Sequence, residues 1–263
     1  MATVSKPIIL DETGQAILGA LEDIAESMDN RNPNRRTQRN ITGDLANLAT
    51  AVAEQDLAKY GYSIGDYFIG ASGYYYYLAD MDTFYGGYNQ YATVNTHHIG
   101  IVVDTKQERA WHSSSDVTNV GYNGSSLKTY INGTVLNNVK SDFRTLFGGS
   151  TGAEHLLSHQ KLYTTAFANW AWTADQVISA LTEVQVFGTS IWSGNSYQQG
   201  EGSTQLEIFR KFAPYKILNA ADKHAWLRSL SSSSSACIAS YNGYAHNYGV
   251  TSSYRVSGLI LFH

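Results

Sequence analysis

The chain has 263 residues, with 18 Lys and Arg against 22 Asp and Glu and a formal net charge of −4 at pH 7. This length allows one large domain or two ordinary ones, and a slightly acidic chain without a basic stripe is a poor candidate for binding nucleic acid. No apolar run approaches the length of a membrane span. The first residues lack the basic start, apolar run and cleavage site of a signal peptide. Neither membrane insertion nor ordinary secretion is therefore expected.

The composition points to a binding surface rather than to a disulfide or thiolate framework. Cys237 is the only cysteine, so an intrachain disulfide and a zinc site built on several thiolates are excluded. Tyr occurs 19 times, Gly 23 times, and charged residues make up only 15% of the chain. Antibody-type binding surfaces use Tyr, Ser, Asn and Gly in this way, although a β protein with half-buried tyrosines has a similar composition.

Residues 1–58 differ from the rest and predict a helical segment for oligomerisation or attachment, followed by one domain over residues 59–263. Two apolar stripes recur at steps of four and three, as in a coiled-coil seam, and a polar linker broken by Pro33 separates them. The seam residues are Ile17, Leu21, Ile24, Ile41, Leu45, Leu48 and Val52. Because short lone helices are marginal in water, we expect copies of the chain to associate, as a trimer. The alternative is that the helices fold back on each other or on the domain.

The first part of the second domain is expected to be mainly β. Strands are predicted at residues 64–69, 74–79 and 98–104, where β-branched and aromatic residues gather or apolar residues alternate. Two helices interrupt this pattern. One is predicted from residue 125 to about 139, and the other over residues 173–181, where Thr173 would be the N-cap.

The last third of the chain is expected to consist of strands and turns. Strands are predicted at 236–240 and 256–262, and an Asn-Gly pair at 242–243 is the strongest short hairpin signal. The polar segments 192–204 and 231–235 predict loops, the second because it is a run of serine.

The sequence holds no constellation that predicts catalysis. It has neither a G-x-S-x-G nucleophile motif nor a Gly-rich phosphate loop leading into a Lys-bearing helix. His97 and His98 would point to opposite faces of a strand and could not share a metal. Asp80 and Asp82 would share one face, but no third fixed ligand accompanies them. Glu183, at an expected helix-to-strand junction, is predicted to be a solvated or hydrogen-bonded structural group. No enzyme activity, metal or cofactor is expected.

Several stretches after residue 60 together resemble a known family. They lie at residues 64–68 (IGDYF), 78–82 (LADMD), 97–99 (HHI), 121–122, 127–130 (LKTY), 183–188 (EVQVFG), 205–206 with Phe209, 226–229 (WLRS) and 236–238 (ACI). This pattern resembles the C-type-lectin-fold proteins found as structural proteins of phages and prophages of Gram-positive gut bacteria. It is similar, more distantly, to the variable proteins that retroelements diversify and to the formylglycine-generating-enzyme branch of the fold.

The resemblance implies an α+β fold of C-type-lectin type that binds a ligand through an irregular β face formed by the last third of the chain. It implies a virion protein, a tail or head fibre made in the host cytoplasm, which joins other virion proteins through its N-terminal segment and attaches to a host-cell surface protein or glycan. The chain departs from the family at residues 256–258, which read Val-Ser-Gly in place of Val-Arg-Pro. The Glu-Pro-Asn and Trp-Asn-Asp motifs of calcium-dependent sugar binding are absent.

The predicted ligand-binding face consists of residues in loops or near the Asn-Gly turn, while Ala236, Ile238 and Val256 are expected to point inward. Its members are Ser231, Ser233, Ser235, Tyr241, Asn242, Tyr244, His246, Asn247, Tyr248, Ser252, Ser253 and Tyr254. Two alternatives stay open: a capsid or tail decoration protein that recognises no receptor, and a hydrolase of cell-surface glycan. A flat, exposed aromatic patch would favour binding, whereas two opposed carboxylates in a cleft would favour the enzyme.

Overall fold

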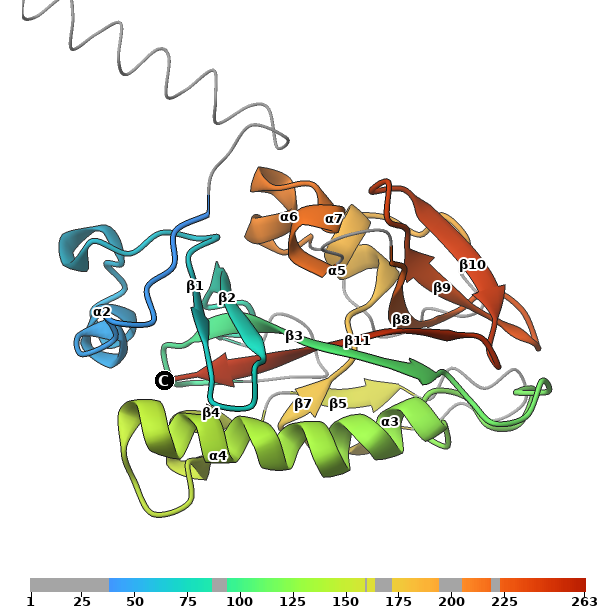
Figure 1. Ribbon diagram of the computed structural model, residues 1–263, viewed down its shortest axis with the longest axis horizontal. Coiled ribbons are helices and arrows are strands. Elements are labelled where there is room, and N and C mark those ends of the chain that lie inside the picture. Colours follow the sequence, from blue (N-terminus) through green and yellow to red (C-terminus); the bar gives the residue numbers. More distant parts are fainter. Residues whose placement is uncertain (1–37, 87–93, 159, 164–171, 194–204, 219–222) are drawn as a thin grey trace, which may run out of the picture.

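The computed structural model describes the chain from residue 38 to residue 263, except for residues 87–93, 159, 164–171, 194–204 and 219–222. Within these residues the chain is a mixed α+β structure with a central sheet and helices on both sides of it (Figure 1). This confirms the predicted α+β class. Among the described helices, none is long and apolar enough to cross a membrane.

Four strands form one half of the sheet: β1 (Tyr67–Ile69), β2 (Tyr75–Met81), β3 (Ile99–Ala110) and β11 (Ser253–Phe262). They lie in the order β1-β2-β3-β11, and each neighbouring pair is antiparallel. The last seven residues of β11 are all buried. A strand in the middle of a sheet with both faces covered is expected to be a continuous apolar run of this kind.

The other half of the sheet is formed by β8 (Ala225–Leu230), β9 (Ser235–Ala239) and β10 (Ala245–Gly249). Strand β8 runs parallel to β11, and β10 is the outer strand of the path β11-β8-β9-β10. The predicted Asn-Gly turn joins β9 to β10: Ser240 N donates to Tyr244 O at 2.8 Å. The hairpin prediction is confirmed, and β10 lies at the end of the molecule opposite to the N-terminal helix α2 (Figure 1).

One long helical rod covers one face of the sheet. It consists of α3 (Ser126–Tyr130), a π-helical turn η2 (Ile131–Val135) and α4 (Leu136–Phe147). It begins as the sequence predicts, with the Ser125 side chain accepting a hydrogen bond from Lys128 N, but it extends beyond residue 139. Its buried stripe recurs every four residues: Leu127, Ile131, Val135, Val139 and Phe143. Such a stripe packs one side of a helix against a core.

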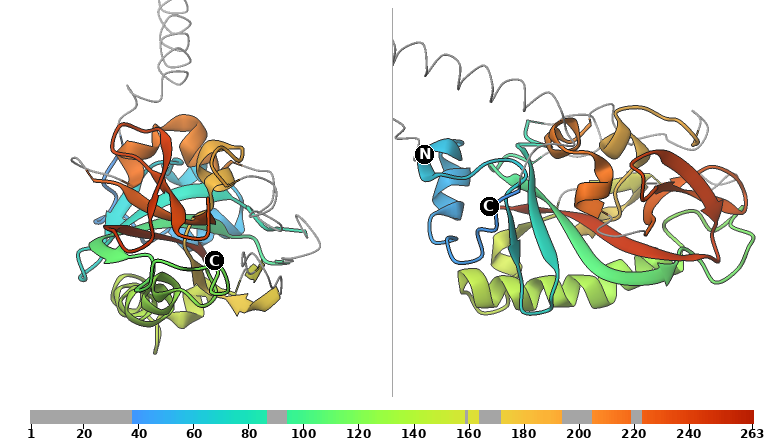
Figure 2. Two further views of the ribbon diagram at one scale, coloured as in Figure 1. Left: turned by 90° about the vertical axis from the view of Figure 1, so that its right-hand side faces the viewer. Right: turned by 45° about the horizontal axis from the view of Figure 1, so that its top comes forward.

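Three short helices cover the opposite side of the sheet, as the end-on view shows (Figure 2). They are α5 (Glu183–Phe187), α6 (Glu207–Lys211) and α7 (Pro214–Leu218). Helix α5 was not predicted from the sequence, although it begins with a capping box in which the side chains of Thr182 and Gln185 bond to each other's backbone N–H.

The helix predicted over residues 173–181 is wrong. The segment forms β6 (Trp172–Gln176) and β7 (Ile178–Ser179). Strand β6 pairs with β5 (Gln160–Tyr163), and β7 pairs with β11. Neighbouring strands thus override the local helix signal at Thr173. A second short strand, β4 (Leu156–Leu157), also pairs with β11, after a 3-10 turn at Ala153–His155.

The described part of the N-terminal segment belongs to the same core as the rest of the chain. It contains α2 (Leu48–Ala53) and a 3-10 turn at Ala58–Tyr60. Ile41 N donates to Tyr67 O, and Tyr67 N donates to Arg39 O, so the segment adds to the edge of β1. The boundary predicted at residue 58 therefore does not separate residues 38–58 from the domain.

The structure corrects the prediction that the second half of the apolar seam contacts another copy of the chain. Ile41, Leu45, Leu48 and Val52 are buried in the core of their own chain, so they are not available to a second copy. An apolar stripe specifies that one side must be buried but not by what, and here the chain's own core covers it. Ile17, Leu21 and Ile24 lie outside the described residues and stay a prediction.

Candidate functional site

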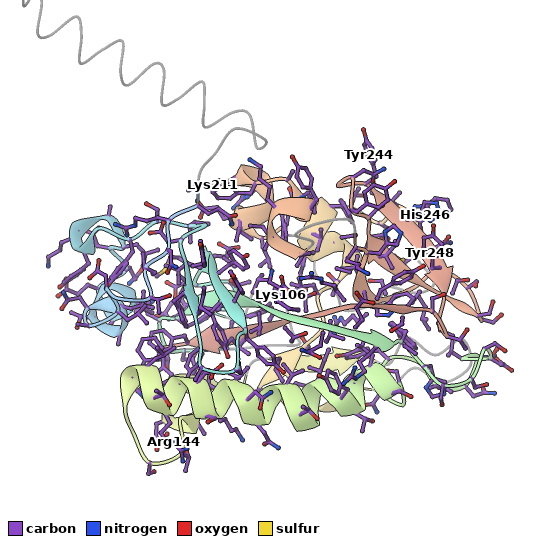
Figure 3. All side chains as sticks on the ribbon, in the orientation of Figure 1. Lys106, Arg144, Lys211, Tyr244, His246 and Tyr248 are labelled. Atoms are coloured by element: carbon purple, nitrogen blue, oxygen red, sulfur yellow. The ribbon has the colours of Figure 1, made fainter. Side chains whose placement is uncertain are left out.

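Strand β10 divides the predicted ligand-binding face between its two sides. Alternate residues of a strand point to opposite faces, so His246 and Tyr248 lie on one side and Asn247 lies on the other. The Asn247 amide donates to Ser231 Oγ at 3.0 Å. Figure 3 shows Tyr244, His246 and Tyr248 along the outer strand. The predicted residues therefore do not share one face: the rings of His246 and Tyr248 lie opposite the contact between Asn247 and Ser231.

The rings of His246 and Tyr248 belong to a continuous set of rings, called the aromatic patch below: Trp192, His224, Tyr241, His246, Tyr248 and Tyr254. Ring centroids lie 5.4 Å apart for Trp192 and His246, and 5.1 Å apart for His246 and Tyr248. The row continues from Tyr248 to His224, again at 5.1 Å. These separations are typical of favourable aromatic pairs.

Tyr254 anchors the aromatic patch to the core. Its ring lies 4.9 Å from His224, 5.3 Å from Tyr248 and 4.9 Å from the buried Trp226. Trp226 in turn donates its indole N–H to Arg109 O at 2.8 Å. Of the predicted tyrosines Tyr254 is thus a half-buried support, whereas Tyr248 lies further out.

Exposed apolar side chains gather at this end of the molecule. The described residues contain six large hydrophobic side chains that are exposed, and five belong to β10, its turn or the loop that bonds to it: Ile191 (52%), Trp192 (43%), Tyr241 (51%), Tyr244 (71%) and Tyr248 (38%). Clustered exposed apolar groups mark interaction sites more often than scattered ones. This grouping matches the sequence-based criterion for a binding surface.

Two members of the aromatic patch, Trp192 and His224, were missed in the sequence analysis. Trp192 starts a segment that predicted only a polar loop, and its position depends on Glu183. The Glu183 carboxylate is buried and accepts hydrogen bonds from Ile191 N and Trp192 N, both at 3.0 Å, and from Ser193 N at 3.1 Å. The Trp192 indole N–H then donates to Ala245 O on β10 at 3.1 Å.

The expectation for Glu183 is confirmed in one respect and corrected in another. Its carboxylate is a hydrogen-bonded structural group, as predicted, but it lies in the first turn of helix α5 rather than at a helix-to-strand junction. No local sequence signal links Glu183 to Trp192, because the carboxylate holds the loop through backbone N–H groups and the Ser193 hydroxyl. Any residue type could offer such backbone partners.

The predicted serines serve mainly as turn residues. Ser231 N, Ser232 N and Ser231 Oγ all donate to Ser235 O, which closes the turn between β8 and β9. Ser233 O accepts from Val117 N at 2.7 Å. In the turn before β11, Ser252 N donates to Gly249 O. The loop prediction for the serine run is confirmed over residues 231–234, and Ser235 begins β9.

The remaining predicted residues are exposed at the edges of the site. Asn242 lies in the turn before β10, where its Oδ1 accepts from Tyr244 N at 3.4 Å, and Ser253 begins β11 opposite Ala110. Neither has a described contact with the rings of the aromatic patch. The structure thus brings together Tyr241, Tyr248, Tyr254 and His246, but not Tyr244 or the rest of the twelve residues.

Among the acidic and histidine residues near β2 and β3, Asp82 contacts both His97 and His98. Asp82 contacts His97 Nδ1 at 2.9 Å and accepts from His98 N at 2.9 Å. His98 is buried, which lowers its pKa, and its Nε2 accepts from Phe84 N. Burial raises the pKa of Asp80 to about 6. In the described part of the chain, no three His, Cys, Asp or Glu residues are grouped as a metal site would require.

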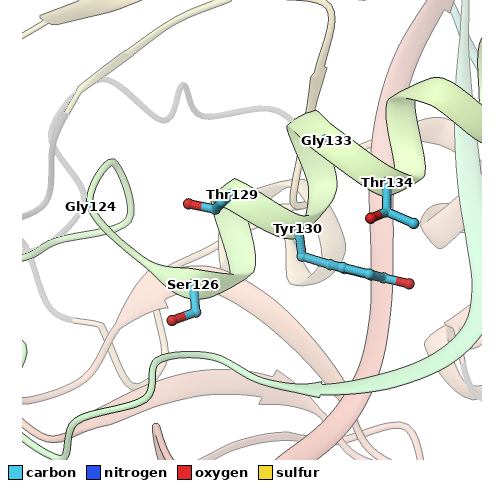
Figure 4. Close-up of a pocket in the computed structure, with 6 residues that line it drawn as sticks. All are labelled: Gly124, Ser126, Thr129, Tyr130, Gly133 and Thr134. Carbon is cyan, nitrogen blue, oxygen red and sulfur yellow. The ribbon is translucent and has the colours of Figure 1, made fainter.

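An open hollow of about 530 Å³ lies beside helix α3 and the π-helical turn (Figure 4). It is lined by Gly124, Ser126, Thr129, Tyr130, Gly133 and Thr134. This lining offers hydroxyl groups and one aromatic ring, and it contains no carboxylate, histidine or thiol. The pair of opposed carboxylates expected for a glycan hydrolase is therefore not found in this hollow.

The aromatic patch is the arrangement in the described residues best suited to hold a ligand, since it combines exposure, ring surface and support from the core. Its groups offer contact surface and hydrogen bonds rather than a nucleophile with an oriented base. Comparison of the chain with models of protein families, with curated proteins and with solved structures found no match.

Proposed function

We propose that the chain is a virion surface protein of fibre type, which attaches to a host-cell ligand through the aromatic patch of a C-type-lectin-like domain. The observation that carries the proposal is the gathering of exposed aromatic side chains at one end of the described structure. Isolated exposed aromatics need no explanation, but a supported cluster of them is characteristic of a recognition surface. The mixed α+β fold is compatible with the C-type-lectin type.

The assembly role is proposed for the N-terminal segment. With the second stripe buried in the domain, association as a trimer would depend on Ile17, Leu21 and Ile24, and the same segment would join other virion proteins. The protein would act without enzyme activity, metal or cofactor, and without contacting nucleic acid or inserting into a membrane. The virion would be assembled in the cytoplasm of the bacterial host.

The assembly role can be measured by light scattering on the full chain and on a chain that begins at residue 38. The truncation begins there because Ile41, Leu45, Leu48 and Val52 belong to the core. We expect a trimer for the full chain and a monomer for the truncated one. Equal masses per particle for both chains would contradict assembly through the three N-terminal residues.

Host attachment is tested by adsorption of the full chain, carrying a fluorescent label, to a panel of Gram-positive gut bacteria. We expect saturable adsorption to some strains, and a loss of about 2 kcal/mol or more in at least one of the exposed patch variants Tyr241→Ser and Tyr248→Ser, as for an aromatic hot spot. Tyr85→Ser is the matched control, because the exposed fraction of Tyr85 is close to that of Tyr248 but its ring stacks on His97 outside the patch. Adsorption to no strain, or adsorption that all three variants keep, would disprove the proposal.

A further inference from the structure

We infer that the ligand of the aromatic patch is an uncharged saccharide chain, and that Trp192 provides the platform for one of its sugar rings. This inference rests on the proposed function and names the class of ligand that the same site would take. It rests on three features of the described residues: the charge of the surface, the spacing of its rings, and the hydrogen bonds that occupy backbone groups on the outer edge of β10.

The described segments that supply most of the aromatic patch hold no acidic residue, lysine or arginine. Residues 229–254 contain no Asp, Glu, Lys or Arg, and neither do residues 184–193, which bring Trp192. Burial and the neighbouring His246 lower the pKa of His224, which favours the neutral form of this ring. An anionic glycan or a charged protein surface would lose hydration here without gaining a countercharge. A neutral ligand has no such cost.

Two basic residues that flank the aromatic patch in the described structure have partners elsewhere. Lys223, which precedes His224, forms an ion pair with Glu108 at 3.2 Å. Arg109, whose carbonyl accepts the Trp226 indole, extends its guanidinium over Tyr130 at 4.6 Å. These contacts direct two nearby cations to other groups, which keeps the ligand surface neutral.

The rings form a row rather than a pocket. Trp192, His246, Tyr248 and His224 follow one another at centroid separations of 5.4, 5.1 and 5.1 Å. A sugar ring has C–H groups on its faces and hydroxyl groups around its rim. Aromatic side chains such as Tyr and Trp match both features, since they combine an apolar ring with a polar edge. A row of them fits a chain of repeating rings.

The outer edge of β10 is covered by side chains, which disfavours a peptide bound as an added strand. Tyr244 O and Val250 N form hydrogen bonds on the side that faces β9 and its turn. Because the backbone groups of successive residues point to alternate edges of a strand, those of Ala245 and Asn247 point to the outer edge. Ala245 O accepts the Trp192 indole N–H, and His246 Nδ1 lies 2.8 Å from both the backbone N and O of Asn247. Strand addition needs such groups to be available.

Trp192 is held before any ligand arrives. Its backbone N–H bonds to the buried Glu183 and its indole N–H bonds to β10. A side chain already fixed in place loses little conformational entropy on binding. Because this arrangement leaves 43% of Trp192 exposed beside His246, the indole is presented to solvent as a preorganised platform.

The test uses the full chain on an array of neutral linear oligosaccharides of glucose, galactose, mannose, rhamnose and N-acetylglucosamine, with matched chains carrying uronic or sialic acid. We expect binding to at least one neutral chain and weaker binding to its acidic counterpart. Trp192→Ala should lower that affinity at least about thirtyfold, as a hot-spot residue does. Trp192→Phe keeps a ring and loses one N–H bond, so a loss of at most about tenfold is expected.

Two controls keep the outcome interpretable. Tyr85→Ala should leave saccharide binding unchanged, and thermal melting should show that all three variants are folded. Binding of acidic chains only, or of no neutral chain, would overturn the inference. Equal losses in Trp192→Ala and Trp192→Phe would also overturn it, because the effect would then come from the indole N–H and not from a ring platform.

Adsorption to bacteria separates the two proposals. If periodate oxidation of the cells abolishes adsorption and protease treatment does not, both proposals are supported. If protease abolishes it and periodate does not, host attachment holds but the ligand is a protein and the saccharide inference fails. If the chain binds a neutral saccharide on the array but adsorbs to no strain, the inference holds and the proposed host attachment fails.

Discussion

Asp80 and Glu183 are buried carboxylates whose surroundings have opposite consequences. Asp80 accepts from Glu207 N at 3.4 Å and has a backbone hydrogen bond from Met81, but burial outweighs both and raises its pKa to about 6. Glu183 accepts from three successive backbone N–H groups and the Ser193 hydroxyl. Hydrogen bonds to a carboxylate favour its charged form, and desolvation disfavours it. The buried Asp80 carboxylate therefore lowers the free energy of unfolding at neutral pH, while the hydrogen bonds of Glu183 stabilise the loop at residues 191–193.

The first prediction concerns Asp80 and pH. Its pKa is about 6 in the folded chain against the ordinary 3.8, so the folded state binds more protons between these values and stability rises as the pH falls from about 6 to 4. Asp80→Asn should raise the free energy of unfolding at pH 7.5 by about 1–3 kcal/mol and reduce this pH dependence. Denaturant unfolding at pH 5 and pH 7.5 measures both.

The exposed Asp116 provides the control for this experiment. It lies in a turn where the Thr118 hydroxyl and backbone N–H hold its pKa below the ordinary value. Asp116→Asn should therefore leave the difference in stability between pH 5 and pH 7.5 as it is in the unsubstituted chain. If Asp80→Asn also left it unchanged, the carboxyl would not titrate in that range.

The second prediction concerns Glu183. Glu183→Gln keeps one acceptor but turns an NH2 group toward backbone N–H groups, so we expect a loss of about 2–3 kcal/mol in the free energy of unfolding. Glu207→Gln is the matched control, because Glu207 forms a partly exposed i,i+4 ion pair with Lys211 worth less than about 0.5 kcal/mol. Chemical denaturation compares the two, and similar small losses would show that Glu183 is not the anchor of its loop.

At the scale of elements, the β9–β10 hairpin carries its aromatic residues at two depths. Tyr244 is 71% exposed beside the Asn-Gly turn. Tyr254, from the adjoining β11, is half-buried among His224, Trp226 and Tyr248. The sequence predicts similar, small stability effects for all the tyrosines of the face. The structure instead predicts different stability effects for Tyr244 and Tyr254, because their rings are buried to different extents.

The third prediction follows from this difference in depth. Tyr244→Ser should lower the free energy of unfolding by less than about 0.5 kcal/mol, as at an exposed site, whereas Tyr254→Ser should lower it by about 2 kcal/mol or more because it removes ring contacts and leaves a cavity. Urea unfolding of both variants gives the comparison. Equal costs would mean that Tyr254 does not support the aromatic patch.

At the scale of the whole molecule, one core extends from the N-terminal helix α2 to the last strand. Leu48 and Val52 of α2 and the apolar residues of β11 are members of the same buried cluster. The long rod α3–α4 covers one side of the sheet, and Phe143 lies between Phe68 and Phe262 from β1 and β11. Residues 38–58 are therefore part of the domain, and the proposed association would depend on other residues.

The fourth prediction tests this assignment. Leu48→Ala should cost about 2–5 kcal/mol of stability, as for a buried leucine, and should leave the number of chains per particle unchanged in light scattering. Ile17→Ala, in the proposed assembly segment, is the complementary variant, and it should weaken association with little effect on the unfolding of the domain. If Leu48→Ala instead dissociated the particle without lowering the stability of the domain, Leu48 would contact another copy of the chain, as the sequence analysis predicts.

Local chemistry in the sequence determined several elements by itself. Ser125 begins a helix because its hydroxyl caps the first turn, and the Asn-Gly pair turns the chain between β9 and β10 because Gly243 readily takes a positive φ, here 88°. The β-forming residues of β2 and β3 give strands near the predicted places. Each of these signals acts over a few neighbouring residues, so it can be recognised without knowing the partners.

The tertiary structure decided which partner each apolar stripe and strand would meet. Residues 173–181 became strands because β5 and β11 lie beside them, and the stripe from Ile41 to Val52 was buried by its own chain rather than by a copy. The aromatic patch joins residues 192, 224 and 241–254, which only the fold brings together. Sequence patterns indicate that a surface must be covered or a backbone group paired, but long-range packing chooses the partner.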